Sequence, residues 1–594
     1  MPSSPVIPDS DLVTIGVKSN GSPIDGTIEI ISIHIDNQVN KVPYCLIEVM
    51  DGNPETEDFP VSDGETFVPG AEIEVLAGYE NDNSSIFKGV VIEHSIRIKR
   101  TRGPVLLVVC KDKSVKMTVG RNNAYFTETT DSEIISKLIG DHDLDADVTS
   151  TSNQLKEVVQ YYATDWDFII ARAEVNGLIV TASDGTVSVK DPDDETDAVL
   201  TLTYGNDIFE FDAVIDAQSQ LSSVQSSAWD VESQEVVSGE SSVSNFDIGN
   251  LSSSTLAEVI GLDTFKQQTY GTLENDMLTS WSKAKATKSK YAKVLGNIKF
   301  QGSQLAVPGK LLELKGVGKR FSGSAFVSGV VHEIGDGNWV TTAKIGLSSN
   351  WFTETVRTEA AVASGLLPGM QGLQIGKVKQ INEDPDSEFR VLVNLPLIQS
   401  SDDGVWARLS TFYATNNAGA FFYPEVDDEV VVGFFNDDPR YPVILGSMYS
   451  SGRPAPSTPE EENNTKEFVS REQLKVIFDE EQKAITIITP NENQMVFNDE
   501  EESITIKDQN GNSIEMSPEG IKINSPASIQ ITADESITMS GTAEVSISSE
   551  GELSMSGLSI SASADTELSA SADASLSLSS AGELSITGTL VTIN

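Results

Sequence analysis

The chain has 594 residues, with 40 Lys and Arg against 90 Asp and Glu, and a formal net charge of -50. This length predicts several domains, each large enough for its own core. The charge excludes nucleic acid and anionic membrane surfaces as binding partners, because basic side chains supply most of that affinity. Hydrophobic residues make up 39% of the chain, which is enough to build folded cores and argues against general disorder.

The N-terminal segment and the cysteines indicate the compartment in which the chain folds. The N-terminus has no basic start followed by an apolar stretch, and no apolar run reaches the ~18 residues of a membrane span. The two cysteines, Cys45 and Cys110, lie inside apolar segments. A disulfide framework is therefore not expected, although a single bridge stays open. The sequence predicts synthesis and folding in the cytoplasm.

Residues 1 to about 360 are predicted to be mainly β with inserted helices. One helix is expected to begin at Thr164, at a sequence resembling a capping box, and to end near Gly177. Another is expected from about Asp276 to Gly296, with lysines toward its C-terminal end, where the helix dipole favours cations. A Gly- and Pro-containing break at residues 361–369 ends this region.

The next region has the pattern of a small antiparallel barrel. Residues 372–449 alternate short β segments with turn signals at 384–386, 416–419 and 436–439, as small closed barrels do. Residues 451–459 are rich in Ser and Pro and precede three glutamates. This stretch is predicted to be a linker.

The last region is a repeat. From Ile521 onward an apolar-polar-apolar triplet recurs every eight residues, with a slip of one residue near Ile560. Alternation within a triplet predicts a strand with one dry face, and the fixed period predicts a stacked array. Wider-spaced strands are predicted just before it, at residues 485–487, 495–497, 504–506 and 514–516. The predicted core residues are Ile521, Ile523, Ile529, Ile531, Ile537, Met539, Val545, Ile547, Leu553, Met555, Leu568, Leu576, Leu578, Leu584 and Ile586.

Length decides which kind of array this is. Eight extended residues reach about 26 Å, too little for one chain to turn three corners around an aliphatic interior. A single-chain β-helix needs longer coils, and a calcium-bound β-roll needs a Gly-Gly-x-Gly-x-Asp nonapeptide, which is absent. Three chains that each give one short strand per turn would bury the apolar faces on a common axis. A Ser-rich disordered tail is the alternative, which the strict apolar spacing disfavours.

Several motifs resemble those of the VgrG spike proteins and the related phage hub proteins of contractile injection systems. The barrel segments are the closest, and the resemblance covers nearly the whole chain. The motifs lie at residues 161–177, 296–302, 307–310, 321–332, 376–378, 384–385, 390–393, 405–409, 422–435 and 438–446.

The resemblance implies a fold and a set of domains. The fold class is mainly β, with phage-hub-like N-terminal β-barrel domains that carry helical insertions, an OB-fold, and a C-terminal triple-stranded intertwined β-helix that forms a trimeric prism. The domains would be a hub region at 1–365, an OB-fold at 366–450, a linker at 451–470 and the β-helix spike at 471–594.

The resemblance also implies a function. A homotrimer would form the central spike of a type VI secretion system, phage tail or extracellular contractile particle, and it would pierce the target envelope when the sheath contracts. Its hub would sit on the hexameric inner tube and contact baseplate proteins, and effector cargo is a further partner. A PAAR-repeat tip protein would bind Leu590, Val591, Ile593 and Asn594. The spike would be assembled in the cytoplasm and delivered into or through the target cell envelope. The alternative is a trimeric fibre or adhesin with a receptor-binding N-terminal head.

Enzyme motifs are missing from the sequence. The histidines His34, His94, His142 and His332 are scattered, without a second ligand at zinc spacing. There is no His-Glu-x-x-His, Gly-x-Ser-x-Gly or phosphate-binding loop. Two Asp-rich loops at 141–145 and 508–512 lack the glycine and glutamate that an EF-hand needs. The sequence therefore predicts no enzyme activity, no cofactor and no metal, and it interprets His332 as a structural residue.

Overall fold

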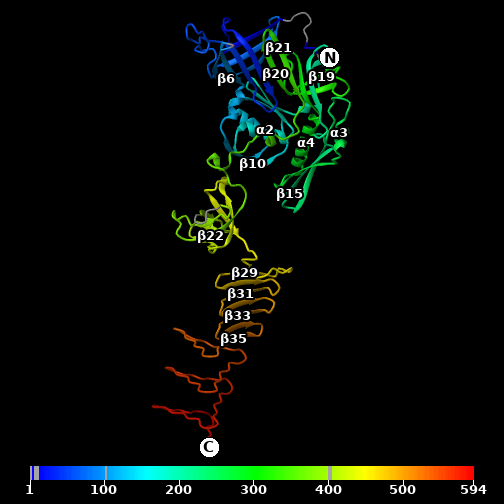
Figure 1. The fold of residues 1–594 in the computed structure, drawn as a ribbon. Helices are drawn as coiled ribbons and strands as arrows, with labels where there is room; N and C mark the ends of the chain where they lie inside the picture. Colours follow the sequence, from blue (N-terminus) through cyan, green and yellow to red (C-terminus); the bar gives the residue numbers. More distant parts are fainter. Residues whose placement is uncertain (1–2, 6–11, 101–102, 399–403, 594) are drawn as a thin grey trace. The chain divides into compact units, whose positions relative to one another are not determined.

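The computed structural model describes the chain except for residues 1–2, 6–11, 101–102, 399–403 and 594 (Figure 1). The fold is mainly β, as predicted. The chain divides into two compact units, Met1–Met448 and Tyr449–Asn594. No helix in the described residues is long and apolar enough to cross a membrane.

A 13-stranded sheet is the largest element of the first unit. Along its main path the strands follow the order β14-β18-β21-β20-β3-β4-β7-β6-β5-β1-β2, and β19 joins β20 while β13 pairs in parallel with β19. Alternation creates the buried face: in β4, Cys45, Ile47 and Val49 are buried. The strands are β1 (Val13–Ser19), β2 (Ser22–Pro23), β3 (Ile30–Gln38), β4 (Tyr44–Met50), β5 (Glu72–Tyr79), β6 (Asp82–Lys99), β7 (Gly103–Lys111), β13 (Ala198–Thr203), β14 (Ile208–Ile215), β18 (Val294–Gln301), β19 (Leu311–Lys315), β20 (Gly323–Gly335) and β21 (Asn338–Ile345).

Two helices and two small sheets form a second core in this unit. Thr130 begins α1 (Asp131–Gly140) with a capping box that includes Glu133, and Thr164 caps α2 (Asp165–Val175) as the sequence predicted. Their apolar faces pack with Ile135, Ile169 and their neighbours in one buried cluster. The sheets are β8 (Asn122–Thr129) with β10 (Leu155–Ala163), and β9 (Asp145–Val148) with β11 (Ile179–Ser183) and β12 (Thr186–Lys190).

The second predicted helix is shorter than expected. Helix α4 (Asn275–Tyr291) packs against β15 (Ser223–Asp230) and β16 (Glu235–Ser242), which form a sheet with β17 (Phe265–Thr269). The prediction ran on to Gly296, but residues from Val294 onward form β18. The reason is visible in β18, where the buried side chains of Ile298 and Phe300 alternate with Lys299. The other α-helices in the described part of the chain are α3 (Ser253–Ile260) and the single-turn α5 (Phe352–Thr355).

The predicted small barrel is present. Strands β22 (Gln374–Gln380), β23 (Val391–Asn394), β24 (Val405–Leu409), β28 (Pro442–Ser447) and β27 (Glu429–Phe434) close a five-stranded barrel, and β25 (Ala414–Thr415) and β26 (Ala418–Gly419) form a hairpin. Val378, Val391, Val430 and Ile444 fill the barrel core. This is the OB-fold that the sequence predicted.

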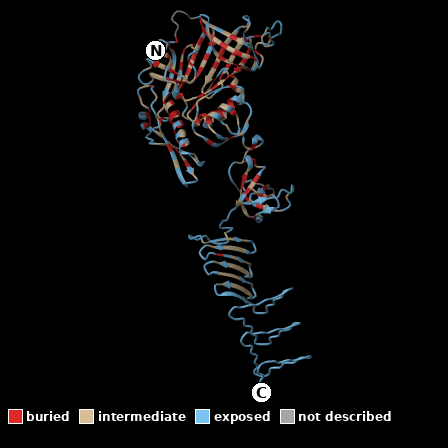
Figure 2. Ribbon diagram, turned by 180° about the vertical axis from the view of Figure 1, so that it is seen from behind, coloured by how far each residue is buried: buried red, intermediate tan, exposed pale blue. Residues whose placement is uncertain are grey.

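The second unit contains an antiparallel meander of seven five-residue strands. They are β29 (Thr465–Val469), β30 (Lys475–Asp479), β31 (Ala484–Ile488), β32 (Gln494–Asn498), β33 (Ser503–Lys507), β34 (Ser513–Ser517) and β35 (Gly520–Asn524). The predicted segments at 485–487, 495–497, 504–506 and 514–516 all lie in these strands. Figure 2 shows the contrast in burial: the first unit contains many buried residues, whereas this unit is half-buried in its sheet and exposed after it.

Candidate oligomerisation site

The meander presents an apolar face. Each strand has five residues, so its second and fourth side chains point to one face. The register joins these positions across the sheet into two continuous series, which we call the apolar rows. One row is Val476, Ile487, Met495, Ile506, Ile514 and Ile523, and the other is Phe478, Ile485, Phe497, Ile504, Met516 and Ile521.

The opposite face is mixed. The middle residues of the same strands are Ile477, Thr486, Val496, Thr505, Glu515 and Lys522. The apolar rows are nevertheless only half covered in the single chain: Ile487 is 46% exposed and Phe497 is 41% exposed. An open hollow on this face is lined by Met495, Ile506 and Ile529 among others. A sheet face of this composition calls for a covering surface.

The repeat continues the apolar rows with side chains that are more exposed than those of the sheet. Each predicted core residue from Ile521 to Ile586 is at least half exposed, from 52% for Ile537 to 70% for Met555. At the end of the chain Leu590, Val591 and Ile593 are also exposed, and Asn594 lies outside the described residues. An unbroken series of exposed Ile, Leu, Val and Met is unfavourable in water and indicates an interface.

The strands expected after residue 524 are not formed within the chain. The first triplet, Ile521–Ile523, lies in β35, but residues 525–593 carry no strand pairing and are almost all exposed (Figure 2). A strand that takes its hydrogen-bond partners from other chains has no partner inside its own. Strand pairing between chains therefore stays a prediction.

After Lys522, charged residues in the repeat lie only at or beside its bends. The chain bends once in each repeat, at positions such as 534–535, 550–551 and 565–566. No Lys or Arg follows Lys522, and every acidic residue after it lies at or beside a bend and outside the apolar triplets. These residues are Asp534, Glu535, Glu544, Glu550, Glu552, Asp565, Glu567, Asp573 and Glu583. The arrangement keeps carboxylates away from the apolar series.

His332 has a structural environment. It lies in β20 and is buried. Its Nδ1 is 2.9 Å from Thr341 Oγ1 and accepts a hydrogen bond from Trp339 Nε1 at 3.3 Å. Burial lowers the pKa of His332 to about 4, so the imidazole is neutral at pH 7. The interpretation of His332 as a structural residue agrees with these contacts. Within the described residues no group of three or more His, Cys, Asp or Glu is placed to hold a metal ion.

We expect His332 to make the first unit less stable in acid. Below pH 6.5 His332 is protonated in the unfolded chain, whereas in the folded chain it stays neutral until the pH falls to its pKa of about 4. The free energy of unfolding is therefore unaffected by the protonation of His332 above pH 6.5, and it falls by about 3 kcal/mol as the pH drops toward 4. Thermal unfolding of wild type and His332→Gln at pH 7 and pH 4.5 measures this. The variant should lose less stability between the two pH values, and parallel losses would contradict the expectation.

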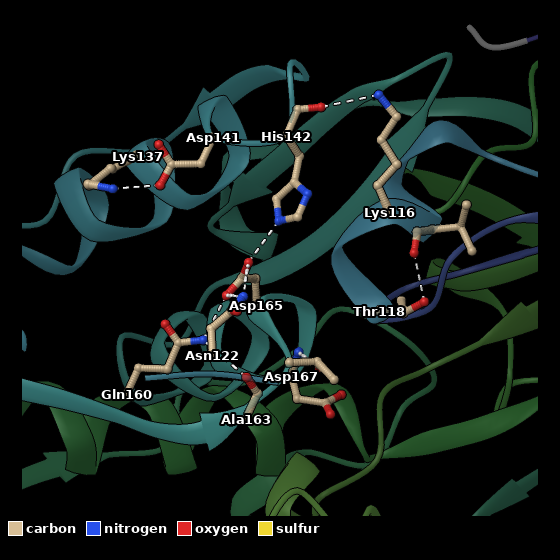
Figure 3. A network of polar contacts seen from close by, with 12 residues as sticks. Lys116, Thr118, Asn122, Lys137, Asp141, His142, Gln160, Ala163, Asp165 and Asp167 are labelled. Carbon is tan, nitrogen blue, oxygen red and sulfur yellow. Dashed lines mark hydrogen bonds and ion pairs between the residues drawn. The ribbon is translucent and has the colours of Figure 1, made fainter. Parts of the chain in front are cut away.

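A polar network at the start of α2 is a feature that the sequence did not reveal (Figure 3). The buried carboxylate of Asp165 accepts hydrogen bonds from Asn122 Nδ2 at 2.9 Å, Gln160 Nε2 at 2.7 Å and His142 Nε2 at 2.7 Å. Burial alone would raise the pKa of Asp165, but these hydrogen bonds outweigh it and lower the pKa. The network ties β8, β10 and the turn after α1 to α2. Asp165 therefore has a structural role at the start of α2, where it links three other parts of the chain.

Family comparisons place the chain. A family model described as the Alg8 N-terminal domain matches residues 9–336, which is more than half of the chain. A model described as the type VI secretion system/phage-baseplate injector OB domain matches residues 374–449. A third, the phage baseplate V C-terminal trimerisation domain, matches residues 484–554. No curated protein matches the chain.

Several solved structures are similar to the chain at low identity. The 43 kDa tail protein of prophage MuSo2 from Shewanella oneidensis is 12% identical, covers 57% of this chain and 99% of its own, and has a TM-score of 0.44. The E. coli c3393 protein, described as a component of the type VI secretion system, is 13% identical over 73% of this chain and 99% of its own, with a TM-score of 0.38. The half-lidded structure of the Francisella PdpA-VgrG complex is 11% identical over 86% of this chain and 88% of its own, with a TM-score of 0.36.

The assignment rests on the family models, because all three superpositions have TM-scores below 0.5. The injector OB match covers the closed barrel, and the trimerisation match covers the apolar rows from Ile485 onward and the start of the repeat. The chain belongs to the family of the Alg8 N-terminal domain, and it carries an OB domain and a C-terminal trimerisation domain of the type VI secretion and phage baseplate class. The predicted resemblance to VgrG and phage hub proteins is confirmed.

Proposed function

We propose that the chain is the non-enzymatic central spike of a contractile injection system and acts as a homotrimer. The observation that carries the proposal is the unbroken series of exposed aliphatic residues on the apolar rows and the repeat, with every carboxylate after Lys522 kept to the corners. Three copies that share one axis would bury these side chains and leave the acidic corners in water. Burial would stabilise the assembly by about 1.5 to 3 kcal/mol for each large aliphatic side chain.

The proposal assigns a task to each region. The hub at 1–365 would join the hexameric inner tube and the baseplate, the OB-fold at 366–450 and the linker at 451–470 would lead into the spike, and residues 471–594 would form the rigid needle that pierces the envelope. The exposed Leu590, Val591 and Ile593, with Asn594, would seat a PAAR-repeat tip protein. Energy would come from sheath contraction, so the chain needs rigidity and no catalytic group. Assembly would take place in the cytoplasm, with delivery into or through the target envelope and effectors as cargo.

Two measurements test the proposal: the mass of the assembly in solution and the location of the chain in the particle. Sedimentation equilibrium of the full chain should give three times the chain mass of 63.9 kDa, and a monomer or dimer would contradict the homotrimer. Electron microscopy of intact contractile particles should then show the trimer on the axis between tube and tip. Density for this chain only on peripheral fibres would favour the fibre or adhesin alternative, which the injector OB match does not favour.

A further inference from the structure

The two cysteines of the chain face each other. Among 594 residues there are only Cys45 and Cys110, and they are direct register partners on the neighbouring antiparallel strands β4 and β7. Residues directly opposite in an antiparallel pair point to the same face of the sheet. Two thiols placed independently in a chain of this length would rarely meet in this way.

The pair lies in the deepest part of the first core. The cross-strand series through it runs Ile35, Cys45, Cys110 and Val91 over β3, β4, β7 and β6. All four residues are buried, and both cysteines have no exposed surface. Both are free thiols in this structure. A buried Cys packs like other small apolar side chains, so the feature that distinguishes this pair is the direct opposition of its two thiols across β4 and β7.

The backbone geometry suits a bond between them. Opposed residues in an antiparallel sheet have Cα atoms about 4.5 to 5.5 Å apart, which lies inside the range of about 4.4 to 6.8 Å found across disulfides. This Cα spacing admits a disulfide without moving the strands apart. Burial, and then the neighbouring Cys110, raise the pKa of Cys45, while burial raises the pKa of Cys110 to about 12. Both groups therefore stay as unreactive thiols in reducing surroundings at neutral pH.

We propose that Cys45 and Cys110 are an oxidisable pair that forms one intramolecular disulfide across β4 and β7. With a disulfide such as oxidised glutathione present during synthesis, before the fold buries the pair, the thiolate of one cysteine attacks a glutathione sulfur and releases reduced glutathione. The thiolate of the second cysteine then attacks the mixed disulfide and releases another. Two protons leave the protein thiols and two glutathione thiols form, so electrons and atoms balance. This proposal does not depend on the proposed spike function.

The bond would act on the central sheet. It would close a loop of residues 46–109, which contains β5 and β6, and would restrict the unfolded chain and stabilise the folded one. If the first unit carries thrust as the proposed spike requires, the bond would also prevent β4 from sliding along β7. The oxidised protein should therefore unfold at a temperature several degrees higher, and dithiothreitol should reverse the shift.

The experiment compares reduced and oxidised full-length protein. Protein is synthesised in a cell-free system with either dithiothreitol or oxidised glutathione, denatured in N-ethylmaleimide and weighed by mass spectrometry. We expect two maleimide adducts after reducing synthesis. After oxidising synthesis we expect none, with a mass about 2 Da lower than the reduced unlabelled chain. Cys45→Ala and Cys110→Ala serve as controls and should show no rise in unfolding temperature under oxidising conditions.

Three outcomes would overturn the proposal: two free thiols after oxidising synthesis, stable glutathione adducts on both cysteines, or a disulfide between chains. Sedimentation of the same samples separates this question from the proposed function. A trimer with free thiols would refute only the disulfide, whereas a monomer with the disulfide would refute only the homotrimer.

Discussion

Ile547→Asp is expected to dissociate the proposed homotrimer. The substitution places a carboxylate in the middle of the apolar series, where Ile547 is followed along the chain by Leu553 and Met555. Each of three copies would lose about 1.5 to 3 kcal/mol of burial, and three carboxylates drawn out of water near one axis would cost several kcal/mol more. The total is at least about 5 kcal/mol for each trimer. Sedimentation velocity over a dilution series should show a lower mass at each concentration.

The neighbouring residue supplies the control. Ser546 is the polar member of the same triplet, so its side chain faces away from the predicted axis. Ser546→Asp adds the same charge one residue away and should leave the trimer intact. Protonation should partly restore Ile547→Asp below about pH 4, since a neutral carboxyl is cheaper to bury. Equal masses and melting temperatures for wild type and Ile547→Asp would contradict a shared apolar axis.

Sequence periodicity predicted the elements whose signal is local. The side chain of Thr164 caps α2, and the alternation at residues 485–516 lies on the strands of the meander. The predicted end of α4 at Gly296 was wrong. The lysines that favour a helix end extend to Lys293, and the strand pattern of β18 begins directly afterwards. The sequence analysis missed the capping box of Thr130 and Glu133 at α1, although its Thr-x-x-Glu spacing could have revealed it.

Contacts between distant residues could not be predicted in the same way. The opposition of Cys45 and Cys110 depends on the register of β4 against β7, which no local pattern fixes. Likewise Asp165 gathers Asn122 and His142 from other elements. The candidate oligomerisation site was predictable because its signal is a repeated spacing of side chains along one stretch. The surface that covers this site could not be predicted, because every apolar triplet is exposed in the single chain and its contacts form only on assembly.

The second large effect is expected for Asp131→Ala, in the first turn of α1. The carboxylate of Asp131 is buried and accepts two hydrogen bonds from the guanidinium of Arg172 on α2, at 2.6 and 3.0 Å, and one from Asn176 Nδ2 at 2.8 Å. Removal of the carboxylate leaves a poorly hydrated guanidinium without its partner and separates α1 from α2. Breaking a buried ion pair costs about 3 to 5 kcal/mol, and the partial exposure of Arg172 places the expected loss at the lower end of that range.

The same helix offers a matched control in the exposed pair Lys137 and Asp141, whose charged atoms lie 2.5 Å apart (Figure 3). Both of these side chains are more than half exposed, so water and salt screen their attraction and Asp141→Ala should cost less than about 1 kcal/mol. Calorimetry of the full chain should therefore show a clear fall in the melting temperature of the first unit for Asp131→Ala and almost none for Asp141→Ala. Asp131→Asn keeps the shape and loses the charge, and it should fall between wild type and Asp131→Ala. If both alanine variants melted alike, the contact between Asp131 and Arg172 would not hold α1 to α2, because burial is what distinguishes the two ion pairs.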